Sequence, residues 1–415
     1  MRRRCALLTL ILMFAFASRA PNAQAQRPSK TLDIYYIDVE GGQATLFVSP
    51  SGESLLVDSG FPGDRDTGRI MDAIKAAGLT QIDHLVSTHY HVDHIGGVQA
   101  LAQLIPIKNF YDHGPTAEPD REQVAGFQKA YADIHAKVKH TVLKAGDKIP
   151  FAGVDWLVVV SGMQPIKTPI KGAPGAGAPN PACATFQPKN TTGDPENGHS
   201  VGSVITFGRF RTIDLGDLLW DREFDLMCPM NRIGTIDLYL TTHHGSKLSG
   251  SEVQVHPLRS RVAVMNNGGR KGGSADAFRV LETAPGLEDI WQLHWAAPAG
   301  VEHNAPGVFI ANIEDNAALA AILTAPPPQP GAGRGGGRGA PDAGAAVAPA
   351  VIAPGGQGQP PVAGPPAAGR GQGGGRGGGA QAHTPAYLIK VSANQDGSFS
   401  VTNTRNGFSK TYPAK

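Results

Sequence analysis

The sequence of 415 residues predicts an α/β (α+β) fold in which two β-sheets pack face to face and helices cover them. Two observations indicate this fold: short β-rich runs fall into two groups along the chain, and stretches with helical spacing lie between these runs. Because a sheet must bury one face against another layer, such a pattern is typical of stacked sheets covered by helices. A third observation is a β-rich hairpin near the C-terminus, which we expect to complete the same domain.

The first group of predicted elements leads to a histidine-rich segment. Its third strand ends at Asp58, before a Ser-Gly turn. The first predicted helix places Ile70 and Ile74 on one face and stops at Gly78. The group comprises strands over residues 32–39, 44–48, 54–57, 82–88 and 109–111 and helices over 69–77 and 98–105.

The second group consists of β-rich runs that are separated by glycine-containing turns. Gly208 and Arg209 turn between two of these runs, and Asp396 and Gly397 turn in the final hairpin. The group comprises strands over 154–160, 204–207, 210–215, 237–242 and 262–265, followed by the hairpin strands 387–391 and 399–402.

The N-terminus is typical of an export signal. Residues 2–4 are arginines, residues 6–17 form an apolar stretch that is short for a membrane span, and Ala23-Gln24-Ala25 offers a small-x-small cleavage site. We therefore expect residues 1–25 to be a signal peptide and the protein to be secreted or periplasmic. No later segment has the roughly 18 uncharged apolar residues that a bilayer span requires.

Two segments have compositions that are typical of unfolded chain. Residues 162–197 are rich in Pro, Gly, Ala and Lys, and residues 326–383 consist mainly of Gly, Pro, Ala, Gln and Arg. Such segments bury too little apolar surface to offset the entropy of ordering. The sequence thus predicts one domain over 30–325 with a flexible insert at 162–197, a low-complexity insert at 326–383, and a hairpin over 384–415 that completes the domain.

Charge and cysteine content limit the function classes. Removal of the predicted signal leaves 33 of the 37 basic residues against 35 acidic ones, so the chain lacks a basic field that would gather nucleic acid without sequence preference. The same cleavage removes Cys5. Cys183 and Cys228 remain, and in an oxidising compartment they either form a disulfide or stay separate.

The segment from Ser87 to Gly97 contains four side chains of metal-ligand type within six residues: His89, His91, Asp93 and His94. Neutral imidazole nitrogens and carboxylate oxygens are ligands that zinc prefers. Binding of a divalent metal removes the repulsion that several charged imidazoles would suffer so close together. A solvated histidine-rich turn is the alternative, and we favour a metal site. Other candidate ligands lie next to predicted strands. Asp217, His243 and His244 each follow a strand, and His199 precedes one. Because the ends of strands converge in space at one edge of a sheet, these residues can share one site.

In this order, the motifs resemble the metallo-β-lactamase fold superfamily. The match comprises His89-x-His91-x-Asp93-His94, then His199, Gly216-Asp217 and His243-His244, and Asp58 matches an early Asp-x-Gly element. Within the superfamily, Leu240-Thr-Thr-His-His-Gly-Ser246 looks most like the hydrolase domain of competence-type (ComEC) DNA-uptake proteins. The chain departs from that type at Glu40-Gly-Gly-Gln43 and lacks its usual His-Pro element after the strand that ends at Met265.

The resemblance implies an αββα four-layer sandwich of two mixed sheets and a site for two metal ions. His89, His91 and His199 would hold one zinc ion, and Asp93, His94 and either His243 or His244, with His244 preferred, would hold the second. Asp217 would bridge the two ions, so that Asp93 and Asp217 are the catalytic candidates. Zinc is the expected metal, and manganese and iron are alternatives. Asp58 would orient a ligand histidine, or would instead cap its own turn.

The resemblance also implies a function. We expect a secreted metal-dependent hydrolase that uses a metal-bound hydroxide, with a phosphodiester as the favoured substrate. The alternatives are a lactone or amide hydrolase of the same fold, an iron-dependent oxidoreductase of the sulfur dioxygenase type, and a non-catalytic binding protein stapled by metal. The expected partner is thus a small-molecule or phosphodiester substrate, and the sequence leaves the oligomeric state open.

Overall fold

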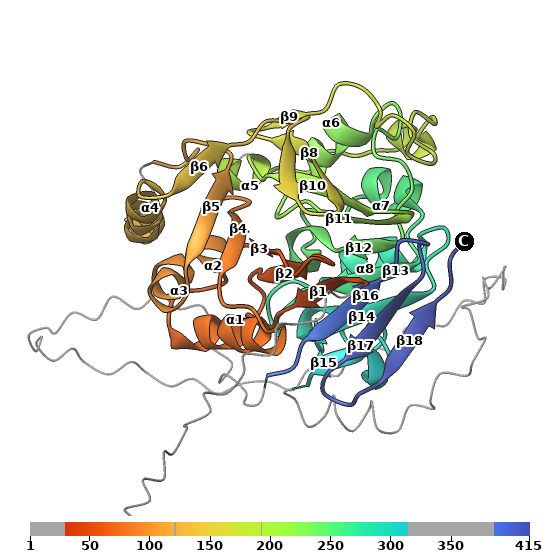
Figure 1. Ribbon diagram of the computed structural model, residues 1–415. Coiled ribbons are helices and arrows are strands. Elements are labelled where there is room, and N and C mark those ends of the chain that lie inside the picture. The colour runs from red at the N-terminus through yellow and green to blue at the C-terminus, as the bar shows by residue number, and fades with distance from the viewer. Residues whose placement is uncertain (1–29, 120–121, 192, 314–385) are drawn as a thin grey trace, which may run out of the picture.

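The structure is a computed structural model (Figure 1), and it describes residues 30–119, 122–191, 193–313 and 386–415. The predicted signal peptide 1–25 and the predicted low-complexity insert 326–383 lie outside these residues. Within the described part, two nine-stranded sheets stack against each other. This architecture confirms the predicted fold of two mixed sheets with helices.

The first sheet is antiparallel at one side and parallel at the other. Strands β1 to β3 and the C-terminal strands pair antiparallel, whereas β3, β4, β5 and β6 run parallel. Its order is β18 (Ser409–Tyr412), β17 (Phe399–Asn403), β16 (Ile389–Ala393), β1 (Leu32–Tyr36), β2 (Thr45–Val48), β3 (Ser54–Val57), β4 (Ile82–Val86), β5 (Ile107–Asp112) and β6 (Lys139–Val142).

The second sheet has the same mixed character. Its strands β7, β8, β10 and β11 pair antiparallel, and β11 to β15 run parallel. Its order is β15 (Ile310–Asn312), β14 (Asp289–His294), β13 (Val262–Met265), β12 (Leu238–Leu240), β11 (Phe210–Asp214), β10 (Gly202–Phe207), β8 (Val154–Ser161) and β7 (Lys148–Phe151), with β9 (Gln164–Pro165) paired to β8.

Helices cover the outer faces of both sheets (Figure 1). The first sheet carries α1 (Asp64–Ala76), α2 (Val92–Ile95), α3 (Val98–Leu104) and α4 (Glu122–His135). The second sheet and its margins carry α5 (Pro195–Gly198), α6 (Trp220–Met227), α7 (Glu252–Leu258), α8 (Ala275–Glu282) and the short 3₁₀ turns η1 (Pro181–Ala184), η2 (Thr242–Gly245), η3 (Ala297–Ala299) and η4 (Gly307–Phe309).

The period of two along each strand divides the core between the layers. In β3, Leu55 and Val57 join the large cluster that includes the second sheet, whereas Leu56 joins the cluster under the helices. Ile70 and Ile74 of α1 pack into this second cluster, as their helical spacing predicts. The alternation therefore fixes which side chains of a strand face the other sheet and which face the helices.

Several elements differ from those that the sequence predicts. Helices α4, α6, α7 and α8 and strands β6, β7, β14, β15 and β18 were not expected. Strand β14 illustrates why a strand can be missed. Its residues Asp289–His294 are buried nearly throughout, so the sequence does not alternate between apolar and polar residues as in a strand with one exposed face. The chain after Phe399 likewise adds a third antiparallel strand, β18, to the expected hairpin.

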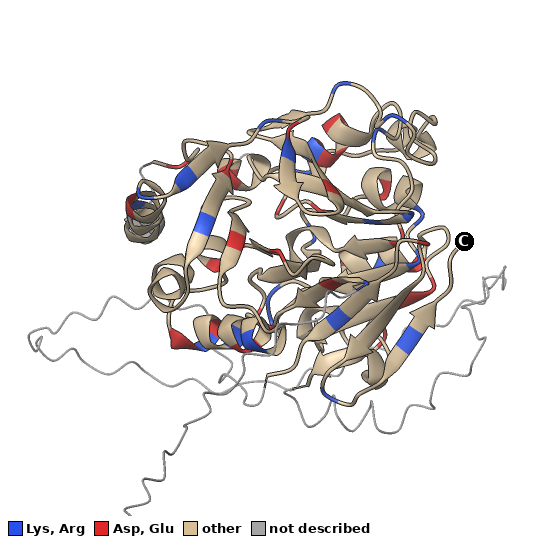
Figure 2. Cartoon of the chain, viewed as in Figure 1, with Lys and Arg blue, Asp and Glu red and all other residues tan. Residues whose placement is uncertain are grey.

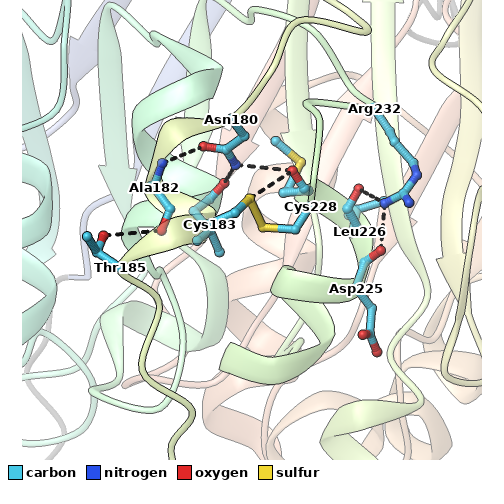
Figure 3. The surroundings of a disulfide bond; sticks show 10 residues. Asn180, Ala182, Cys183, Thr185, Asp225, Leu226, Cys228 and Arg232 are labelled. Atoms are coloured by element: carbon cyan, nitrogen blue, oxygen red, sulfur yellow. Dashed lines mark hydrogen bonds between the residues drawn. A yellow bond between two sulfur atoms is a disulfide. The ribbon is translucent and has the colours of Figure 1, made fainter.

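The segment 162–197 differs from the flexible insert that its composition predicts. The described residues of this segment contain β9, η1 and α5, and Cys183 forms a disulfide with Cys228 beyond α6 (Figure 3). Asn180 Nδ2 also donates to the carbonyl oxygens of Met227 and Val253, at 3.1 and 2.7 Å. A disulfide between residues that are 45 positions apart lowers the conformational entropy of the unfolded chain. This effect stabilises the folded protein by roughly 4 kcal/mol. This attachment offsets the scarcity of apolar side chains.

Two further properties of the described residues bear on location and partners. None of their helices is both long and apolar enough to cross a membrane. Figure 2 shows Lys and Arg interspersed with Asp and Glu along the helices and strands, rather than gathered on one element.

Candidate metal centre

The histidine-rich segment lies where a parallel strand of the first sheet ends. Strand β4 stops at Val86, and the chain then turns through His89 and His91 into the single-turn helix α2. Gly42 and Gly97 allow this turn to pack closely: an added Cβ would lie 2.5 Å from Asp93 O at Gly42 and 2.1 Å from Ser59 O at Gly97. Larger residues at these positions would push the turn out of place.

Four side chains from both sheets meet beside this turn, and we call Asp93, His94, Asp217 and His244 the four-residue cluster. His94 Nε2 lies 3.4 Å from Asp93 Oδ2 and 3.3 Å from Asp217 Oδ2. His244 Nε2 lies 3.5 Å from Asp93 Oδ2 and 3.3 Å from Asp217 Oδ1. All four residues are buried.

The four-residue cluster fits a divalent metal ion. Two ligands that each lie about 2.0–2.2 Å from one tetrahedral ion are about 3.3–3.5 Å apart, and the observed separations match this value. His94 Nε2, His244 Nε2 and Asp217 Oδ1 are also buried without a hydrogen-bond partner among the described residues. Buried polar atoms are rarely left unpaired, so their convergence points to an ion that satisfies them.

Asp58 orients the histidines from behind the cluster. His94 Nδ1 lies 2.7 Å from Asp58 Oδ2, and since a carboxylate accepts, Nδ1 carries a proton and Nε2 is the ring nitrogen that faces the cluster. Thr88 donates its N–H to Asp58 Oδ1 and its hydroxyl to Asp58 Oδ2. The hydroxyl oxygen then accepts from His89 Nδ1 at 3.1 Å, which leaves His89 Nε2 as an acceptor. Thr88 is a supporting residue that the sequence did not single out, although it directly precedes the motif.

His89 and His91 form a second, smaller group, which we call the His89–His91 pair. His89 Nε2 lies 3.1 Å from His91 Nδ1, and the His89 ring lies 4.0 Å from that of His94, centroid to centroid. Two nitrogens in this relation fit two ligands of one ion. On its other side, His91 Nε2 lies 3.4 Å from both Glu118 Oε2 and Asp194 Oδ1, two residues that sequence reasoning missed.

His199 does not join the His89–His91 pair in any cluster of three ligand-type residues within the described chain. Its Nδ1 lies 2.9 Å from Pro195 O, and its ring lies 5.5 Å from that of His113, centroid to centroid. Because Nδ1 donates to this carbonyl oxygen, Nε2 is the ring nitrogen of His199 that a metal could reach. The residue stands at the end of α5, and its position depends on the segment that precedes this helix.

The structure separates the roles of the two neighbouring histidines. His244 belongs to the four-residue cluster, whereas His243 is more exposed and places Nδ1 3.1 Å from Ser249 Oγ. His243 Nε2 still lies 3.3 Å from Asp217 Oδ2. Both residues have φ of 55°, as Asp58 has φ of 59°, in the left-handed region that side chains disfavour. Strain of this kind often accompanies functional sites.

The electrostatics of the cluster favour a cation. Burial alone would raise the pKa of Asp93, but Lys271 and His94 hold it well below its usual range. Burial likewise opposes ionisation of Asp217, yet His243, His244 and His94 lower its pKa strongly. For His94, burial lowers the pKa, but the carboxylates of Asp217, Asp93 and Asp58 outweigh it and raise the pKa well above the usual range. Ionised carboxylates thus dominate the site.

Lys271 is the main residue of the site that sequence reasoning missed. It lies on the glycine-rich loop after β13, forms an ion pair with Asp93 and lies over the ring of Phe61, with Nζ 5.3 Å from the centroid. Its side chain is 43% exposed, so the ammonium group is at the mouth of the site. The only sequence signal is position, since this loop follows a strand end at the edge where the site forms.

Comparison with known proteins gives three results. Residues 37–162 match the metallo-beta-lactamase superfamily. Recombination protein 2 of Haemophilus influenzae is 22% identical over 268 residues, which are 64% of this chain and 27% of that protein. A hydroxyacylglutathione hydrolase of Aeromonas salmonicida is 40% identical over 65 residues, which are 16% of this chain and 22% of that protein.

Among solved structures, the metallo-beta-lactamase fold protein YhfI of Bacillus subtilis is similar, with 16% identity and a TM-score of 0.38. The similarity covers 63% of this chain and 95% of YhfI. The chain spans about a quarter of the length of the curated relatives that it matches.

Proposed function

Because this chain carries a metallo-hydrolase domain of the metallo-beta-lactamase superfamily, we propose that it is an exported two-zinc hydrolase that acts on a phosphodiester. The observation that carries the proposal is the four-residue cluster, in which buried, unpaired ligand atoms from both sheets converge. Asp93, His94, Asp217 and His244 would hold one ion. His89 and His91 would hold the other, with Asp217 as a ligand that both ions would share and His199 as the proposed third ligand.

Bound divalent ions in such a site polarise a carbonyl or phosphoryl oxygen and lower the pKa of water. The chain itself prepares the ligands for this role. Asp58 holds a proton on Nδ1 of His94, and Thr88 holds the proton of His89 on Nδ1, so that in both rings Nε2 is the nitrogen directed to an ion. Because these hydrogen bonds already hold the two histidine rings in place, the rings lose little conformational entropy when a metal ion or a substrate binds.

Lys271 supports an anionic substrate. Its ammonium group lies beside Asp93 at the mouth of the site and is partly exposed, so it can bind an oxygen of a phosphodiester group. A neutral lactone or amide would gain less from this cation. The proposed preference for a phosphodiester therefore depends on Lys271 as well as on the resemblance of the His243-His244-Gly-Ser segment.

Export of the protein is supported by the disulfide between Cys183 and Cys228, because such cross-links persist in oxidising compartments. The interspersed charges in Figure 2 favour a small substrate over general nucleic-acid binding.

The experiment is hydrolysis of bis(p-nitrophenyl) phosphate by the mature protein loaded with zinc or manganese. We expect turnover that disappears on chelation and in Asp217→Ala, but persists in Asp225→Ala, an exposed aspartate of α6 that contacts Arg222. Absence of turnover in protein with bound metal would reject the phosphodiester assignment. Lactone, amide and β-lactam substrates would then be tested on the same preparation, with metal content measured by elemental analysis.

A further inference from the structure

A separate group of ligand-type side chains lies at the edge of the first sheet, where β5, β6 and α4 meet (Figure 1). It consists of Asp112 at the end of β5, His135 in the last turn of α4 and His140 in β6. One ligand atom from each of the three residues lies within 4.8 Å of the others. None of the three belongs to the metal centre described above.

Asp112 is held rigidly at the centre of this group. Its Oδ1 accepts from the N–H of Gly114 at 2.9 Å, and its Oδ2 accepts from the hydroxyl of Tyr131 at 2.9 Å. His140 Nε2 lies 2.7 Å from the same Oδ2. The side chain is 1% exposed, so a buried carboxylate is presented toward the two imidazoles.

His135 is not explained by an ion pair between Asp112 and His140 alone. Its ring lies 4.0 Å from that of His140, centroid to centroid, at an interplanar angle of 31°. Two protonated imidazoles in this relation would repel each other. The Nδ1 of His135 is buried and has no hydrogen-bond partner among the described residues. An unpaired, buried imidazole nitrogen beside a carboxylate and a second imidazole is an arrangement that a metal ion would satisfy.

We propose that Asp112, His135 and His140 bind a divalent transition-metal ion at a site separate from the catalytic centre. Two imidazoles and one carboxylate suit zinc, nickel, copper and iron rather than calcium or magnesium. The His140 side chain is 25% exposed, which leaves access for the ion and a position for solvent. The proposal does not depend on the proposed hydrolase function.

Such an ion would connect α4 to the sheet next to the catalytic centre. Asp112 begins the loop that leads to Glu118, which contacts His91, and the carbonyl oxygen of Gly114 in this loop accepts from the hydroxyl of Tyr90 at 2.6 Å. The site would thus stabilise one wall of the proposed active site without touching its ligands.

The test is the number of zinc ions retained by the metal-stripped mature protein after equilibration at about 1 μM free zinc. His140→Gln keeps a donor for Asp112 and removes the imidazole ligand, whereas His135→Phe keeps an aromatic ring and removes the nitrogen. We expect each variant to retain one ion fewer than the wild type. His256→Ala, a change at a partly buried histidine that contacts Val280 and Thr283, should retain the wild-type number.

A second measurement separates this site from the catalytic centre. Copper(II) is added to Asp217→Ala and to the double variant Asp217→Ala/His135→Phe, and the electron paramagnetic resonance spectrum of the double variant should lack one imidazole nitrogen coupling that the single variant shows. Circular dichroism identifies a variant that fails to fold. In that case the zinc count of the other variant, His140→Gln or His135→Phe, tests the proposal. An unchanged zinc count in every folded variant, together with an unchanged copper spectrum, would overturn the proposal.

Discussion

In the four-residue cluster, ligand-type atoms from both sheets lie 3.3–3.5 Å apart, whereas the His89–His91 pair offers two nitrogens from one loop at 3.1 Å. Asp217 and His244 are placed by the ends of β11 and β12, which are neighbouring strands of one sheet. The candidate third ligand of the pair, His199, stands instead at the end of the short helix α5.

This difference between the four-residue cluster and the His89–His91 pair shows how strand ends and loops contribute to a binding site. A ligand that directly follows a strand has a well-defined position, because hydrogen bonds to the neighbouring strands and packing in the core hold the strand in place. Asp93 and His94 lie in the short helix α2, directly after strand β4, whereas His199 at the end of α5 has no strand directly before it. We therefore expect the four-residue cluster to bind metal more tightly than the His89–His91 pair.

The largest expected effect is that of Asp217→Ala, which removes the carboxylate that both groups would share. Turnover should fall by on the order of 10³-fold or more, because metal-centred residues act as a unit. Metal content, measured by elemental analysis, should fall as well. Full metal content in the folded variant would show that the cluster is not the binding site.

Glu196 connects the His89–His91 pair to its surroundings, and its titration should affect stability. Burial would raise its pKa, but His113 and the N–H groups of Ala117 and Tyr90 lower it to about 2, from a usual value of 4.5. A depressed carboxyl pKa adds stability above the unfolded value, and this stability is lost as the pH falls through the folded value. The gain at neutral pH is about 3 kcal/mol.

Urea unfolding of metal-free wild type and Glu196→Gln measures this contribution. The variant should be less stable by about 3 kcal/mol near pH 6, and the difference should shrink steadily between about pH 5 and pH 2. A difference that does not vary with pH would mean that Glu196 acts through packing rather than charge.

Asp58→Asn tests whether the tighter group depends on orientation from behind. The amide has one acceptor oxygen in place of two and carries no charge, so it cannot accept from the Thr88 N–H on one oxygen and hold the proton of His94 with a second, charged oxygen. Zinc affinity should fall by about 10–100-fold, measured by competition with a chromophoric chelator. Unchanged affinity would favour the simpler view that Asp58 only caps its turn.

Lys271→Ala separates metal binding from substrate binding. We expect KM for the anionic phosphodiester to rise about tenfold, the effect of one lost charged hydrogen bond of about 1.4 kcal/mol, while metal content stays constant. Lys271→Arg should recover part of the loss. Kinetics equal to those of the wild type would remove the argument for an anionic substrate.

His199→Ala should have the smallest effect, because this residue lies outside the four-residue cluster. We expect the second ion to bind several-fold more weakly, while the first ion keeps its affinity, as measured by zinc titration calorimetry. Equal loss of both ions would show that His199 belongs to the tighter group and would reverse the comparison.

Many residues of this site could be predicted from the sequence, because they lie in short motifs of metal-ligand type. The segment from His89 to His94 and the position of Asp217 after a strand predicted residues that the structure brings together at Asp93, His94, Asp217 and His244. Lys271, Glu118 and Asp194 were not predicted, because they lie on loops whose course depends on contacts between distant segments. Strand β14 was also missed, since a strand buried on both faces lacks the alternation that marks β-structure.

By itself the sequence determined the alternating strands, the helix over α1 and the residue types that can bind metal, because these depend on local periodicity and side-chain chemistry. Only the tertiary structure decided which of His243 and His244 joins the cluster, and it also paired Cys183 with Cys228 and left His199 outside the four-residue cluster. Each of these outcomes is set by the relative position of segments far apart in the chain. That position follows from the packing of two sheets, a property that no local pattern contains.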